Sequence, residues 1–378
     1  MSDPATTAAP SPGAPAGAGE DLSFASQWRL MWLRFRRHRL ALAGGAVLLA
    51  LYFAAAFCEF LAPLPPDRRH ARYVQCPPQK IRFFDAEGSF HLRPFVYGLK
   101  SEGVDDWQRS YVPDTGVVYP LRLFAAGPEY EMWGLFRADL HLFAAADGAP
   151  LFLFGTDDLG RDLFSRILYG ARISLTIGLV GVALTFFIGI LLGGLAGYFG
   201  GWVDILVQRC IEILMSIPQL PLWMALSAAL PAHWPPLGTY FGITLILSLM
   251  GWTGLARVVR GRFLSLRDED FVVAARLSGT GALGIIFRHL LPSFLSHVIT
   301  SATLAVPGMI LGETALSFLG IGLRSPVVSW GVLLQTAQNF QAVAMAPWLL
   351  LPGLFIVVAV LAFNLVGDGM RDAADPYS

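Results

Sequence analysis

Charged residues are scarce in this chain. Asp, Glu, Lys and Arg make up 14% of its 378 residues, against roughly 25% in an ordinary soluble domain. Hydrophobic residues make up 55%. So few polar side chains cannot cover the surface of a soluble domain, which makes a membrane protein the leading class. The charges are also unevenly placed, and three long stretches contain none: residues 174–203, 213–256 and 325–366.

Cysteine is equally rare, with only Cys58, Cys76 and Cys210. No two of them have the spacing of metal ligands, and their odd number and scatter disfavour a disulfide framework. The acidic turn at Asp157 and Asp158 lacks the residue pattern of a calcium-binding loop and has no histidine nearby. We therefore expect no metal site on this chain.

Catalytic and nucleotide-binding motifs are missing as well. The sequence contains no His-Glu-x-x-His, no Gly-x-Ser-x-Gly and no Gly-x-x-x-x-Gly-Lys-[Ser/Thr], so we expect no catalytic residue and no bound cofactor. The two halves show no internal repeat of the kind expected in a secondary transporter. A secondary, ion-coupled transporter nevertheless remains an alternative function for this chain.

Six apolar stretches are long enough to cross a bilayer, which takes about 20 residues each. They lie at about residues 40–62, 174–198, 205–230, 239–259, 293–315 and 346–367. Arginines cluster before the first stretch and between the fourth and fifth, and clustered basic residues stay on the cytoplasmic side. The predicted fold is therefore an all-α membrane protein with six transmembrane helices and with both termini in the cytoplasm.

This topology divides the chain into four segments. Residues 1–28 are expected to be disordered and cytoplasmic, and residues 29–62 hold a basic segment and the first span. Residues 63–154 form a long extracytoplasmic insert, where aromatic residues alternate with Gly, Pro and charge as in short strands. A lid or docking domain and a plain spacer are equal alternatives for it. Residues 155–378 hold the core of the protein, with the other five spans.

A densely patterned stretch, Gly155-Thr-Asp-Asp-Leu-Gly-Arg-Asp162, leads into the second span. Asp157 or Asp158 is suited to cap a helix here, and the arginines that follow are suited to internal ion pairs. The stretch resembles the GTDxxGRDxxSRxxxGxRxSL signature of the dipeptide/oligopeptide family of ABC-transporter permeases. The resemblance marks as external motif residues Gly155, Thr156, Asp157, Gly160, Arg161, Asp162, Arg166 and Arg172.

The loop between the fourth and fifth spans, residues 261–292, contains two alanines followed by Gly279. Acidic residues before it favour a helix that starts near Asp270, and Gly279 would end that helix. Pro292 would then begin the fifth span. The loop resembles the EAA loop that couples such permeases to their ATPases, although Val273 replaces the family's usual acid; an amphipathic connector without a partner is the alternative. The implied coupling residues are Asp270, Phe271, Ala274, Ala275, Gly279, Leu291 and Pro292.

Prolines interrupt the third span, at Pro218 and Pro221. Irregular backbone survives in a membrane where it is buried in protein or lines a wet cavity. Pro218, Gln219 and Pro221 are therefore candidates for the wall of the translocation path, with a simple packing kink as the equal alternative. Glu313 joins them because an ionisable residue within a span suggests a function by default. It begins a segment similar to the family's ETxLSFLGxGL pattern.

Two more acids lie in or beside spans. Glu59 is near the outer end of the first span, where we expect water to reach it. Glu212 is three residues from Arg209 on one helix, so the two side chains are expected to neutralise each other. A proton relay from Glu212 to Glu313 is disfavoured because the two acids fall in opposite halves of the bilayer.

The resemblance implies a permease subunit of an ATP-driven importer, with peptide as the family's usual cargo and alternating access as its mechanism. The implied partners are a second homologous permease subunit, two ABC ATPase subunits, an extracytoplasmic substrate-binding protein and the lipid bilayer, with no nucleic acid. ATP and magnesium would be bound by the ATPase subunits. The implied location is the bacterial cytoplasmic (inner) membrane.

Overall fold

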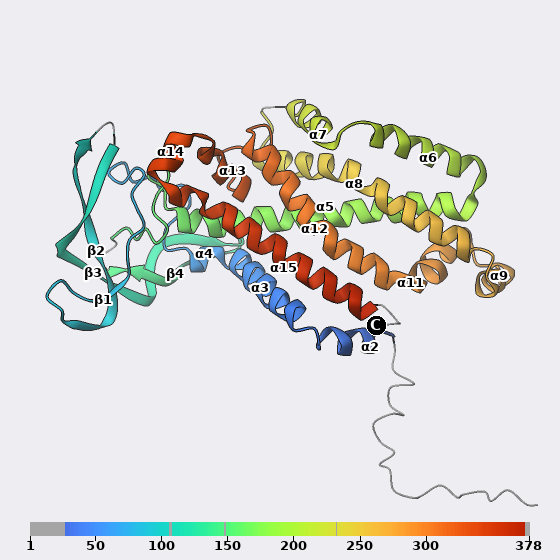
Figure 1. Cartoon of the computed structure of the whole chain (residues 1–378), viewed down its shortest axis with the longest axis horizontal. Coiled ribbons are helices and arrows are strands. Elements are labelled where there is room, and N and C mark those ends of the chain that lie inside the picture. Colours follow the sequence, from blue (N-terminus) through green and yellow to red (C-terminus); the bar gives the residue numbers. More distant parts are fainter. Residues whose placement is uncertain (1–26, 106–107, 147–148, 232, 375–378) are drawn as a thin grey trace, which may run out of the picture.

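The computed structural model describes residues 27–105, 108–146, 149–231 and 233–374. Long helices run side by side as an elongated bundle, and a small sheet lies at one end of it (Figure 1). Five candidate membrane-spanning helices are long and apolar enough to cross a bilayer within these ranges. They are α3 (Arg39–Ala56), α5 (Leu163–Phe199), α8 (Pro236–Leu266), α12 (Leu295–Phe318) and α15 (Leu351–Ala374), the last preceded by a 3-10 turn, η4 (Pro347–Leu350).

The third predicted span is broken. It consists of α6 (Gly201–Ser216) and α7 (Gln219–Ala228), whose axes differ by 88°. Ile217 and Pro218 lie between them, and a proline cannot donate the backbone hydrogen bond that would continue α6. The kink expected at Pro218 is confirmed, and it divides the predicted third span, residues 205–230, between two helices. The described residues contain five candidate spans, or six if the bent pair crosses as one.

Helix α5 begins before the predicted second span. Its N-cap is Asp162, whose carboxylate accepts a 2.8 Å hydrogen bond from the Ser165 backbone N–H. The cap expected at Asp157 or Asp158 is therefore wrong, because both of those carboxylates lie in the turn that precedes the helix. Gly200, with φ of 64°, ends α5.

The fifth span starts later than its proline. Pro292 lies in a shorter apolar helix, residues 282–293, which combines α10 (Ala282–Ile285), a π-helical turn (Ile286–Leu290) and α11 (Leu291–Ser293). Phe294 leaves the helical region, with φ of −130°, and α12 begins at the next residue. The prediction that Pro292 opens the membrane helix is corrected accordingly.

The segment between the first two spans folds into a four-stranded antiparallel sheet in the order β1-β2-β3-β4. The strands are β1 (Arg82–Phe84), β2 (Phe90–Asp105), β3 (Gln108–Met132) and β4 (Phe136–Ala145). Strand β3 is long enough to pair with β2 in its first half and with β4 in its second half. The all-α class predicted for the whole chain is therefore too narrow, although the short strands expected in this segment are present.

Short helices complete the described chain. Two of them flank the first span: α2 (Gln27–Phe35) precedes α3, and α4 (Cys58–Leu61) follows it. Helix α9 (Asp270–Leu277) follows α8. Three short elements between α12 and η4 are α13 (Trp330–Gln335), the 3-10 turn η3 (Thr336–Gln338) and α14 (Phe340–Met345).

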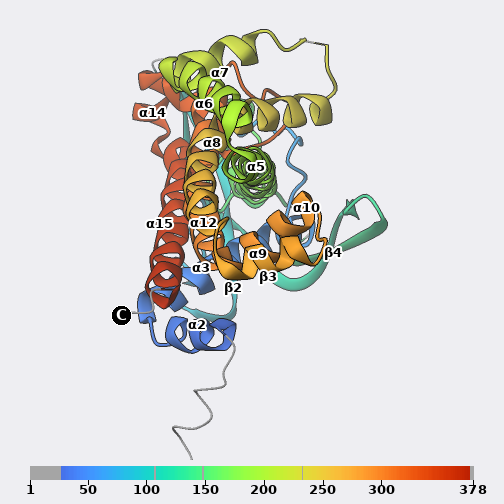
Figure 2. The ribbon, with the colours of Figure 1, turned by 90° about the vertical axis from the view of Figure 1, so that its right-hand side faces the viewer.

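Helix α5 occupies the middle of the bundle, and Figure 2 shows it almost end-on among its neighbours. It packs against α8, α12 and α3. Glycines on α5 permit close contact with α8: a Cβ on Gly193 would lie 2.8 Å from the Ala256 Cα, so a larger residue would push the two helices apart. The buried apolar side chains at this centre form the hydrophobic core of the bundle.

Candidate functional site

The turn before α5 is held by a buried ion-pair network. The Asp157 carboxylate accepts hydrogen bonds from the Arg161 backbone N–H at 2.9 Å and from its Nε at 2.7 Å, and Arg166 Nε lies 3.6 Å away. All three residues are buried. The predicted internal ion pairs are thus present, and because buried charges must be paired, this turn has one well-defined geometry.

Other motif residues fasten the turn to the segment after α4. Thr156 Oγ1 accepts from the Cys76 backbone N–H at 2.8 Å and donates to the Tyr73 carbonyl at 2.5 Å. Gly155 and Gly160 have φ of 77° and 70°, a region that favours glycine. The glycines, threonine and acids of the motif therefore act as structural residues of the turn before α5.

Asp162 is a buried acid of this motif, 1% exposed. Its carboxylate accepts from the Ser165 hydroxyl at 2.6 Å as well as from the Ser165 backbone. Desolvation by burial, with a smaller contribution from the neighbouring Asp157 charge, raises the pKa of Asp162 to about 7 against the lowering effect of the Ser165 hydrogen bonds. Asp162 is therefore the motif residue whose charge depends on pH near neutrality.

Arg172, the last residue of the motif, reaches the end of the first span. Its guanidinium donates to both carboxylate oxygens of Glu59 at 2.6 Å and to the carbonyls of Ala55 and Ala56 at 3.0 Å. Glu59 is only 5% exposed. The expectation that water solvates Glu59 is wrong, because Arg172 replaces that water.

Glu313 lies in the centre of a serine cluster. Its carboxylate is 0% exposed and accepts from Ser317 and Ser329 at 2.7 Å and from Ser174 at 3.3 Å. These serines belong to α12, to the N-cap of α13 and to α5. The cluster joins three separate segments of the chain and leaves Glu313 no surface facing a cavity.

A cavity of about 420 Å³ lies between α5, α7, α8 and α12. Gln219 lines it, whereas Pro218 and Pro221 do not, and Glu313 does not. Two buried polar groups of its wall, Thr185 Oγ1 and Trp223 Nε1, have no hydrogen-bond partner within the described part of the chain. The lining residues are Thr185, Phe186, Gln219, Trp223, Gly251, Gly254, Leu255, Val258, His297, Ser301, Ala305, Gly308 and Met309.

Helix α9 lies beyond the end of the bundle (Figure 1). One face packs inward through Val272 and Ala275, which are 0% and 7% exposed. The other face presents Phe271, Val273 and Leu277, the last 83% exposed. The helix starts at Asp270, and Gly279 follows its end with φ of 80°, so the helix predicted here is confirmed, while Ala275 points into the molecule.

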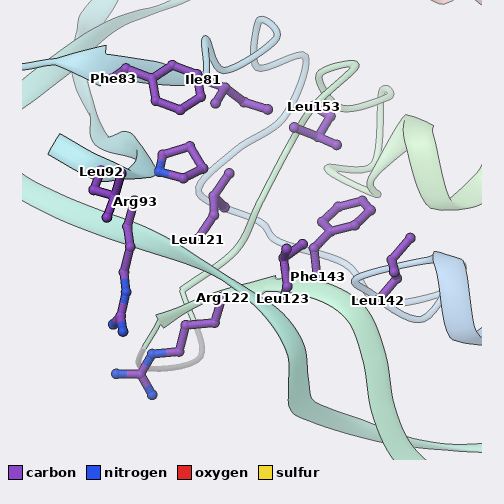
Figure 3. Close-up of a pocket in the computed structure, with 11 residues that line it drawn as sticks. Ile81, Phe83, Leu92, Arg93, Leu121, Arg122, Leu123, Leu142, Phe143 and Leu153 are labelled. Carbon is purple, nitrogen blue, oxygen red and sulfur yellow. The ribbon is translucent and has the colours of Figure 1, made fainter.

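The sheet carries a second, open hollow, of about 1020 Å³ (Figure 3). Its wall is apolar except for Arg93 and Arg122, whose guanidinium groups point to the same side, away from Leu153 (Figure 3). Sequence reasoning missed this hollow because most of its residues come from four strands whose register only the folded sheet defines, and Ile81 and Leu153 come from outside them.

The candidate membrane helices, one of them broken beside a cavity, define the class of the protein as an integral membrane protein. The family model described as "binding-protein-dependent transport system inner membrane component" matches residues 189–377. A model described as "N-terminal TM domain of oligopeptide transport permease C" matches residues 26–78. The chain therefore belongs to the family of inner membrane components of binding-protein-dependent transport systems, and it is a permease subunit rather than an enzyme.

Curated relatives share this family. The dipeptide transport system permease protein DppC of Bacillus subtilis (strain 168) is 41% identical over 225 residues, which is 59% of this chain and 68% of that protein. The oligopeptide transport system permease protein OppC of the same organism is 38% identical over 224 residues, 59% of this chain and 71% of that protein. OppC of Haemophilus influenzae is 41% identical over 224 residues, with 59% and 70% covered. No relative favours the secondary transporter alternative.

Proposed function

We propose that this chain is one of two permease subunits of an ATP-driven peptide importer in the bacterial inner membrane. The cargo proposal rests on the relatives, which are named as dipeptide and oligopeptide permeases. The proposal of coupling to an ATPase rests on helix α9, which has one face in the core and an apolar face that no described residue covers.

Helix α9 and its flanks, within residues 261–292, are the proposed contact with an ABC ATPase. Phe271, Val273 and Leu277 would fill a groove of the partner, while Val272 and Ala275 transmit its movement into the bundle core, where they belong to the central apolar cluster. Val273 stands where the family has an acid, so this contact relies on apolar burial, worth about 25 cal/mol per Å². ATP and magnesium would be held by two such ATPase partners.

The same end of the bundle also holds α2 and the C-terminal end of α15, and the sheet lies at the other end (Figure 1). Arg34, Arg36, Arg37 and Arg39 are exposed at the α9 end, and clustered arginines favour the cytoplasm. Both termini would then be cytoplasmic and the sheet extracytoplasmic, where a substrate-binding protein would deliver the peptide.

The cavity beside the α6–α7 break is the proposed part of the translocation path on this chain. Gln219, Thr185 and Trp223 offer polar groups to a peptide there, with two of them otherwise unpartnered. A second permease subunit would supply the opposite wall. Closure of the ATPases would move α9, and alternating access would open the cavity first to one side of the membrane and then to the other.

The test is a pull-down of the tagged chain from its native membrane, followed by peptide uptake in the recovered complex. We expect a second permease, P-loop ATPases and ATP-dependent uptake. The Leu277→Asp variant should lose the ATPases, because it charges the exposed face of α9 without touching the core. A matched control is Leu92→Asp, a leucine 87% exposed on the sheet, which should keep them. Recovery of the chain alone would refute the proposal.

A further inference from the structure

The turn between β3 and β4 exposes three large apolar side chains. Trp133, Leu135 and Phe136 are 50%, 74% and 61% exposed. Immediately behind them, Glu131 and Arg137 form an exposed ion pair with a 3.2 Å contact. The hairpin therefore has an apolar tip and a charged base, an order that suits a boundary between hydrocarbon and water rather than bulk water.

The hairpin comes closer to the membrane helix as it nears its tip. His141, on the returning strand, lies with Nδ1 2.6 Å from the carbonyl oxygen of Ala62. At the tip, the Trp133 indole N–H donates a 2.7 Å hydrogen bond to the carbonyl of Ala56, the last residue of α3. Ala62 lies beyond the end of the span, whereas Ala56 belongs to it. The hairpin therefore approaches the span toward its tip, and the tip points toward the bilayer.

The backbone of the turn is held in an uncommon conformation. Trp133 and Gly134 both have positive φ, 54° and 69°. Positive φ is rare for a residue with a bulky side chain and persists only where the surroundings impose it. Here the conformation is held by the indole hydrogen bond to Ala56, which fixes the direction in which the apolar tip points.

The apolar tip is continuous with the exposed apolar surface of the first span. The Trp133 ring lies 5.6 Å from that of Phe57, and Phe57 lies 4.8 Å from Phe53, centroid to centroid. Phe53 and Leu49 on α3 are 57% and 74% exposed. Because α3 is a candidate membrane span, such side chains face lipid, and the hairpin extends that surface outward.

We propose that the β3–β4 turn, residues 133–136, inserts its side chains into the leaflet that surrounds the C-terminal end of α3. Trp133 would sit at the interface, where tryptophan is enriched, with Leu135 and Phe136 in the upper acyl region, about 5–10 Å deep. Glu131 and Arg137 would remain among the headgroups. The sheet is then fixed at a set height above the membrane, independent of the cargo and of α9.

The test measures whether position 135 is in lipid. Cys210→Ser removes the exposed cysteine, while Cys58 and Cys76 are buried. In that background, Leu135→Cys is labelled with an environment-sensitive fluorophore, and the full-length chain is placed in phospholipid nanodiscs. Nitroxides on the lipid acyl chains should quench this label several-fold more than one at Leu92→Cys, a leucine 87% exposed on β2. Iodide in water should quench the two labels in the opposite order.

Two outcomes would overturn the proposal. Equal quenching of both labels by iodide, with little by nitroxide lipid, would place the tip in water. A label at position 135 shielded from both quenchers in the complete transporter would place the tip against another subunit instead of lipid. Loss of ATPase binding or of peptide uptake in other variants would affect neither outcome, so failure of the proposed function is distinguishable from failure of the hairpin contact.

Discussion

The guanidinium of Arg172 forms a two-pronged ion pair with the Glu59 carboxylate, with both contacts at 2.6 Å. The two residues are 113 positions apart in the chain. The pair connects α5 to α4, and Arg172 also donates to the carbonyls at the end of α3. It thereby fixes the C-terminal end of α3, which the hairpin turn also contacts through Ala56.

Breaking this pair should destabilise the protein. Glu59→Gln leaves the Arg172 charge without its partner in a largely buried position, at a cost of about 3 kcal/mol. Thermal unfolding of the purified chain in detergent would measure it. The exposed Arg209–Glu212 pair, with side chains 71% and 59% exposed, provides the control: Glu212→Gln should cost under about 0.5 kcal/mol. Similar costs for both variants would contradict the structural role given to Arg172.

Asp162 should make stability fall as pH rises. Its pKa is raised from 3.8 to about 7 by burial, so between these values the folded chain keeps a proton that the unfolded chain has released. The contribution of the protonated acid is fully present below the lower value and is lost as pH approaches the upper one. Asp162→Asn, which keeps an N-cap acceptor, should gain stability over the wild type as pH rises through this range. A constant difference in melting temperature would show that Asp162 does not titrate there.

The cap itself can be separated from the charge. Asp162→Ala removes the acceptor of the Ser165 N–H and should cost about 0.5–2 kcal/mol relative to Asp162→Asn. Neither variant has an ionisable side chain at position 162, so melting curves recorded at one pH compare the two free of ionisation at this site. We expect the ATPases to remain bound in both variants; their loss on pull-down would contradict an external position for this motif.

Two substitutions should uncouple transport while the chain remains in the membrane. Gly279→Pro imposes φ of about −65° on a residue at 80°, and Ala275→Arg forces a charge into the buried face of α9. Peptide uptake in vesicles should be lost in both. Ala274→Ser, on the exposed side of the same helix, is the control and should retain uptake. Full uptake by either variant would count against α9 as the coupling element.

The cavity predicts a transport defect of a different kind. Gln219→Leu removes a polar group from the cavity wall while keeping a similar volume, so it should reduce uptake without changing the recovery of ATPases. Met215→Leu on the outer surface of α6, at a residue 49% exposed, is a control in the same bent span. Unchanged uptake by Gln219→Leu would exclude Gln219 from the translocation path.

The sequence by itself determined the features that depend on local composition. Charge-free stretches placed the membrane helices, since an unpaired charge in hydrocarbon is costly. The break in the third span at Pro218 followed from a proline in the chain, because proline lacks a backbone donor. The start of α9 at Asp270 and the turn at Gly279 likewise followed from residues a few positions apart.

Only the tertiary structure decided which distant groups meet. Glu59 was expected to be solvated by water, since its partner Arg172 lies on another helix and the sequence does not show that the two meet. Glu313 accepts hydrogen bonds from serines of three segments whose positions in the sequence are not related by any regular spacing. The register of the sheet, in which β4 pairs with the second half of β3, brings the Trp133 indole to the Ala56 carbonyl. Such contacts depend on how helices and strands pack. A buried polar side chain exchanges its hydrogen bonds with water for hydrogen bonds with another side chain, and this is possible only after the fold has brought the two together.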